Sequence, residues 1–105
     1  MIDLGSVKAH LRVDGDDEDG LIQGYTDAAI STFELWTNRK LIAAGEPLPD
    51  PLGNGLVFSK SIQQGALLLI GHWYATREAV AVGTIATEMP LATQALWKPH
   101  RWVNV

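Results

Sequence analysis

The stretch that decides the fold of this chain is Leu67-Leu68-Leu69-Ile70-Gly71-His72-Trp73-Tyr74-Ala75-Thr76-Arg77-Glu78. Apolar residues recur in it and just before it at spacings of three and four, which predicts a helix from Ile62 to Val80. These residues form two adjacent stripes, Ile62, Ala66, Leu69 and Trp73 in one and Leu67, Ile70 and Tyr74 in the other. A helix that is apolar around so much of its circumference needs neighbours on more than one side, and we expect a partner subunit to be one of them.

A second long helix is predicted from Asp17 to Trp36, where Ile22, Tyr25, Ala29, Phe33 and Trp36 form one apolar face. Trp36 and Trp73 lie on the apolar faces of their helices and are therefore predicted to be core residues. Asp3 is suited to cap a short N-terminal helix, and Pro90 to begin a short C-terminal helix that Pro99 ends. The predicted fold class is all-α, with the two long helices packed antiparallel.

A long connection separates the two long helices. Residues 43–59 contain three prolines and three glycines, which exclude a continuous helix, so we expect a flexible loop at about residues 43–58. Asn54-Gly55 is a strong turn signal, and Leu56-Val57-Phe58 is suited to a short strand, which leaves room for a small β-hairpin.

The length and composition of the chain exclude several classes of protein. A chain of 105 residues has room for one domain, expected to span residues 1–105, and its 47% apolar content excludes a chain that is disordered throughout. No apolar run is long enough to span a bilayer, and no secretion signal is recognisable, so we expect synthesis in a cytoplasm. The absence of cysteine excludes disulfide scaffolds, thiol nucleophiles and cysteine-ligated metals. A net charge of −4 with scattered basic residues argues against tight DNA binding.

The acidic run from Asp14 to Asp19 has two interpretations. A calcium loop of the EF-hand type that began at Asp14 would need glycine at its sixth position and glutamate at its twelfth. Those positions hold Asp19 and Tyr25. We therefore expect the carboxylates to cap the second helix and to face the positive end of its dipole.

The three histidines do not predict a catalytic or metal site. His10, His72 and His100 are far apart, and none has a partner four residues later. His72 has a general-base interpretation, but no nucleophile motif accompanies it. We expect no enzymatic activity, no cofactor and no metal. A small helical DNA-binding regulator is the main alternative function, and an enzyme that uses His72 is a second.

Three stretches of the chain, taken together, resemble a known family. They are Val7–Asp14 with the acidic helix that follows it, Trp36–Leu41, and Gln64–Glu78, which leads on to Met89-Pro90-Leu91 and to Leu96–Arg101. The order of these stretches, the spacing between them and the identity of their residues are similar to those of the head–tail connector proteins of tailed bacteriophages. The resemblance implies a structural protein of the virion neck that forms a ring, expected to be a dodecamer, between the portal and the tail-completion (stopper) protein. The resemblance further implies that DNA passes through such a ring without specific binding, and it leaves open whether the source is a phage, a prophage or a domesticated particle.

The resemblance also suggests roles for particular residues. Tryptophan with arginine is a frequent interface composition, so the tail is expected to dock onto the portal through Lys98, His100, Arg101 and Trp102. In the isolated protein, the tail from Lys98 to Val105 is expected to be disordered or variable. Subunit contacts are expected from Arg39, Leu68, Arg77 and Trp97, although either arginine is equally well read as an ordinary surface residue. The loop is expected to face the lumen or the stopper with Glu46, Leu48, Asp50, Leu52 and Leu56, and its alternative is a connection with no further role.

Overall fold

The computed structural model describes residues 1–51, 53–76 and 89–102, and most of these lie in helices. The elements, in chain order, are α1 (Leu4–Leu11), α2 (Asp19–Thr37), β1 (Lys40–Ile42), β2 (Gly55–Val57), α3 (Lys60–Thr76), α4 (Leu91–Trp97) and the 3₁₀ turn η2 (Lys98–His100). The prediction of a mostly helical protein is confirmed, with each described helix boundary within a few residues of its expected place. The predicted end of the third helix, residues 77–80, lies outside the described residues.

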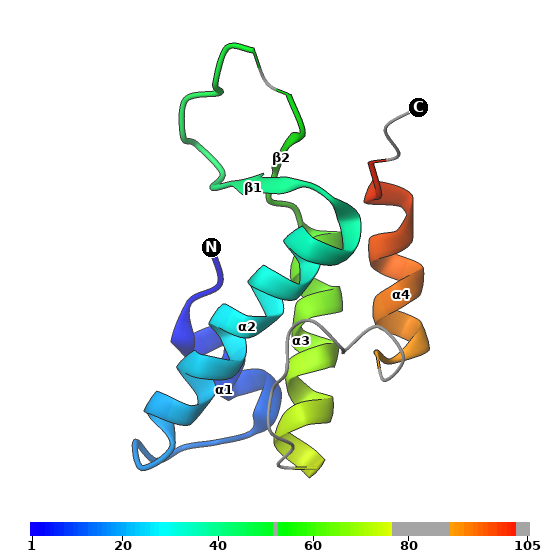
Figure 1. Cartoon of the computed structure of the whole chain (residues 1–105). Coiled ribbons are helices and arrows are strands. Elements are labelled where there is room, and N and C mark those ends of the chain that lie inside the picture. The colour runs from blue at the N-terminus through cyan, green and yellow to red at the C-terminus, as the bar shows by residue number, and fades with distance from the viewer. Residues whose placement is uncertain (52, 77–88, 103–105) are drawn as a thin grey trace.

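Helix α3 forms the centre of the fold, and α1, α2 and α4 all pack against it. In Figure 1, α2 and α4 lie on either side of α3, and the chain runs in one direction along α2 and α4 and in the other along α3. The two apolar stripes of α3 therefore have different neighbours within one protomer. Ile62, Ala66, Leu69, Ile70 and Trp73 are all buried there, so no partner subunit is needed to cover them.

The first helix begins as its sequence predicts. The Asp3 carboxylate accepts hydrogen bonds from the Ser6 hydroxyl (2.6 Å) and the Ser6 backbone N–H (3.1 Å). These bonds, the hydroxyl first, lower the pKa of Asp3, because they stabilise the charged carboxylate.

The acidic run does not act as the predicted cap of α2. Glu18 occupies the cap position but makes no capping hydrogen bond with its side chain. Instead, the Lys8 ammonium lies 2.9 Å from a carboxylate oxygen of Asp19 and 3.1 Å from one of Asp16, and these contacts, that with Asp19 first, raise the pKa of Lys8. Glu18 accepts a 2.6 Å hydrogen bond from the Tyr74 hydroxyl. The carboxylates thus hold the α1–α2 turn against α1 and α3. The contact with Tyr74 could not be predicted from local sequence, because Tyr74 lies 56 residues after Glu18.

The β-hairpin prediction is wrong. A strand does occur at Gly55–Val57, one residue earlier than expected, but it pairs in parallel with β1, with Leu41 opposite Leu56. Parallel neighbours need a long connection, and the segment from Ala43 to Asn54, in which most of the described residues are exposed, provides it. The loop is accordingly shorter than predicted, because its last residues are part of the sheet.

Helix α4 is fastened to α3 at a glycine. Gly65 has no side chain, so the indole of Trp97 lies directly against the α3 backbone. The Trp97 Nε1–H donates to the Ile62 carbonyl at 3.1 Å, and the Thr93 hydroxyl donates to the Gly65 carbonyl at 2.9 Å. Trp97 also meets Phe33 of α2 edge-to-face, with ring centroids 5.2 Å apart. Trp97 is fully buried in the protomer, so the prediction that it contacts another subunit is wrong.

Candidate assembly surface

Two arginine–tryptophan pairs meet where α2 and η2 end. The Arg39 guanidinium lies 5.2 Å from the centre of the Trp102 ring, and Arg101 lies 5.1 Å from that of Trp36. Stacking of this kind favours the cation over the electron-rich ring face. The structure thus brings Arg39, expected at a subunit interface, together with two residues expected to dock onto the portal. Trp36 is half-buried rather than a core residue, because its ring forms part of this surface.

The C-terminal residues are held by hydrogen bonds at this surface. The Trp102 N–H donates to the Thr37 carbonyl at 2.8 Å, which satisfies a carbonyl left free at the end of α2. Arg39 Nε–H donates to the His100 carbonyl at 3.0 Å, and the His100 ring lies 3.2 Å from the Ser61 hydroxyl. The prediction of a disordered tail is therefore wrong for residues 98–102. We call these five residues the C-terminal arm; residues 103–105 lie outside the described residues.

Basic residues that are scattered in the sequence gather at this end of the protomer. The end of α2, the start of α3 and the end of η2 lie together in Figure 1, opposite the α1–α2 turn. They carry Arg39, Lys40, Lys60, Lys98 and Arg101, whereas the turn carries the acidic run from Asp14 to Asp19. Spacing along the chain does not reveal this basic end, because hydrogen bonds between residues as far apart as Arg39 and His100 create it.

Several of the remaining candidate residues lie on other parts of the described chain. Leu68 is half-buried on α3, and Leu56 is half-buried in β2. Glu46, Leu48 and Asp50 are exposed on the loop. Arg77 and Leu52 were predicted to lie at the interface and on the loop, respectively, but both fall outside the described residues.

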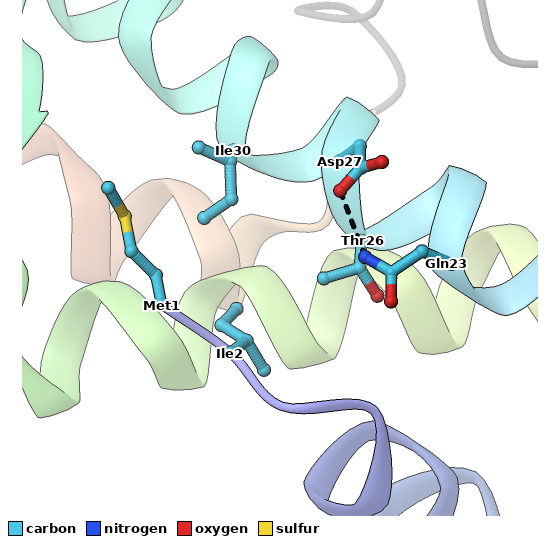
Figure 2. A pocket seen from close by; sticks show the side chains of 6 residues that line it. All are labelled: Met1, Ile2, Gln23, Thr26, Asp27 and Ile30. Carbon is cyan, nitrogen blue, oxygen red and sulfur yellow. Dashed lines mark hydrogen bonds between the residues drawn. The ribbon is translucent and has the colours of Figure 1, made fainter. Parts of the chain in front are cut away.

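One hollow of the described surface lies beside the N-terminus. Figure 2 shows a shallow pocket between the N-terminal segment and α2, lined by Met1, Ile2, Gln23, Thr26, Asp27 and Ile30. Its one acidic side chain, Asp27, accepts a 3.0 Å hydrogen bond from Gln23. Among the described residues, no three histidine, aspartate or glutamate side chains gather in a way that suits a metal ion. Within the same residues, no helix is long and apolar enough to cross a membrane.

Arginine and tryptophan are both enriched among the residues that dominate binding at protein interfaces, and this surface carries two pairs of them, with Arg101 exposed and Arg39 half-buried. Comparison with known proteins agrees with such a role. Searches of curated proteins and of solved structures found no significant match. The family model described as "Phage gp6-like head-tail connector protein" matches residues 1–101, which is almost the whole chain. The chain therefore belongs to the phage gp6-like head–tail connector protein family.

Proposed function

We propose that this protein is a non-catalytic connector subunit that forms a ring between the portal and the tail-completion protein, with DNA passing through the ring. The match to the connector family over residues 1–101 carries this proposal, since the family implies a structural role at the head–tail neck of the virion. The arginine–tryptophan surface supports it, because such surfaces are common where proteins meet. A dodecamer is the expected ring, and Arg39 and Leu68 are our proposed subunit contacts from the sequence.

Three residues of the C-terminal arm, His100, Arg101 and Trp102, are proposed to contact the portal. Arg101 is exposed, and Trp102 is half-buried and presents part of its ring. The test is capture of the protein by its cognate portal from the same genome, with the variants Arg101→Glu and Trp102→Ala. We expect both to lose capture while they still unfold cooperatively, and the matched reversal Arg12→Glu, on the exposed end of α1, to be captured like the parent. Capture of all three variants at parental levels would exclude the docking role of the arm.

The loop is proposed to face the lumen or the stopper protein. Its only charges are Glu46 and Asp50, and it has no lysine or arginine, so it lacks the cations that hold phosphates. Replacing both acidic residues by lysine should allow particles to assemble but slow the packaging or ejection of DNA. Normal DNA transit in this double variant would rule out the lumen and leave contact through Leu48, Leu52 and Leu56 to be tested by shortening the loop.

The basic end favours one alternative, a small DNA-binding protein, because five cations there suit a phosphate backbone. Light scattering over a range of concentrations, with and without duplex DNA and with and without portal, separates the two functions. A discrete large mass that is independent of DNA supports the connector. A mass that changes only with DNA, and less so as salt is raised, supports the alternative.

A further inference from the structure

The outer side of α2 has an apolar face with no covering element among the described residues. Leu21 and Leu35 are 41% and 67% exposed, unusually high fractions for leucines on a long helix. Gly20 and Gly24 lie on either side of Leu21 in the sequence, and a side chain added at either would meet no atom within 4 Å. Together with Leu21 and Tyr25 they line a shallow hollow near the start of the helix.

The outer side of α4 has a complementary face. Leu91 is 82% exposed, the highest fraction of any large apolar residue described. Ala95 and Lys98 are also exposed and follow it at spacings of four and three, so the three side chains lie on one side of the helix. This face therefore carries an apolar knob at its start and a cation at its end.

The arrangement of the helices allows these faces to meet between two copies of the chain. α2 and α4 both pack on α3, touch each other where Phe33 meets Trp97, and run in the same general direction (Figure 1). Rotation about an axis roughly parallel to the helices keeps that direction, so it places α4 of one copy beside α2 of the next. A contact between two different faces, repeated by a pure rotation that divides a full turn, closes into a ring, whereas any other repeat gives an open filament.

We propose that α4 of one subunit packs on α2 of the next, with Leu91 in the hollow formed by Gly20, Leu21 and Gly24 and with Lys98 paired to Asp27. The spacing fits, because Lys98 lies about 10 Å along its helix from Leu91 and Asp27 about 7 Å from the middle of the hollow. A lysine side chain spans the difference. Asp27 is exposed and, besides its bond from Gln23, has a second carboxylate oxygen. The proposal rests on the ring proposed above and assigns Lys98 to the neighbouring subunit rather than to the portal.

The contact is small, and this sets the expected behaviour. A helix of seven residues covers much less than the roughly 800 Å² per partner that stable pairs bury. Two copies alone should therefore associate weakly, whereas a closed ring, in which every subunit makes the contact twice, should persist.

Cysteine cross-linking tests the contact directly, because the natural chain has no cysteine. The double variant Leu91→Cys/Gly24→Cys, assembled with the portal and mildly oxidised, should give a ladder of covalent multimers that reducing agent abolishes. The control Leu91→Cys/Leu35→Cys uses a second exposed leucine of α2, which lies about 16 Å along the helix from Gly24. It should give no ladder, and each single-cysteine variant should give dimers at most.

A charge exchange provides an independent measurement. Lys98→Asp and Asp27→Lys should each weaken self-association roughly fivefold, as expected for an exposed ion pair turned into a repulsion. The double exchange should restore it, which a merely structural role for either residue would not do. Rings that form without the Leu91→Cys/Gly24→Cys ladder, or single reversals without effect, overturn the contact but leave the connector function standing. Failure to assemble in any condition, including with portal, overturns both.

Discussion

Replacing Gly65 by alanine is expected to lower the free energy of unfolding by about 2 kcal/mol. The added methyl carbon would lie 2.7 Å from Cδ1 and 3.0 Å from Cε2 of Trp97, and closer still to its Nε1. The indole has no space in which to retreat, because it is fully buried and packed against Phe33. Either α4 moves away from α3 or the ring turns, and both break the hydrogen bond from Trp97 to Ile62.

Three contributions set the size of the effect. Forcing one extra carbon into a packed core costs about 1–3 kcal/mol. Loss of the hydrogen bond costs about 1 kcal/mol, and the better helix propensity of alanine returns about 1 kcal/mol. For a domain of this size, a net loss of about 2 kcal/mol corresponds to a fall in Tm of roughly 10 °C.

Urea and thermal unfolding followed by circular dichroism measure the effect. Gly24→Ala is the matched control, because it makes the same change in the second turn of α2, where the methyl group meets no atom within 4 Å. This control should gain up to about 1 kcal/mol. Combining Gly65→Ala with Trp97→Leu should cost less than the two changes added together, since they act on one contact. If Gly65→Ala is as stable as the parent while Gly24→Ala shows its gain, the packing argument is refuted.

Three further predictions concern the hydrogen bonds and charges of the fold. Thr93→Val removes the buried hydrogen bond to the Gly65 carbonyl at nearly constant side-chain volume. It should lower the free energy of unfolding, measured in the same urea titrations, by about 1–2 kcal/mol. The control Thr76→Val, at an exposed residue, should lower it by less. The pKa of Asp3 is lowered, so its contribution is complete above its ordinary value of 3.8 and is lost as pH falls through the lowered value. Asp3→Ala should therefore be less stable than the parent at pH 6, and unfolding measured down to pH 2 should show the gap closing. Deleting residues 101–105 removes the bond from Trp102 to Thr37 and both cation–π pairs. The deletion should therefore lower Tm by several degrees. An unaltered Tm would show that the arm contributes nothing to the stability of the protomer.

Local patterns in the sequence determined the helices and part of their boundaries. The spacing of apolar residues places Ile62, Leu69 and Trp73 on one side of a helix whatever the rest of the fold does, because 3.6 residues per turn is a property of the backbone. The cap at Asp3 was predictable for the same reason, since donor and acceptor are three residues apart. Family membership was also recognisable from the order of such segments, with no chemical motif required.

Tertiary structure alone decided which elements meet. An apolar stripe indicates that a helix packs against another element but does not identify that element. The stripes of α3 therefore predicted a neighbouring subunit, whereas α2 and α4 of the same chain pack there. The parallel pairing of β1 with β2 depends on where α2 and α3 place the ends of the loop, and a turn signal at Asn54 carries no information about that. The buried place of Trp97 depends on an absent side chain 32 positions earlier, at Gly65. The basic end arises in the same way, because contacts between residues distant in the chain, such as Arg39 and His100, are chosen by the global packing of the helices and leave no periodic trace in the sequence.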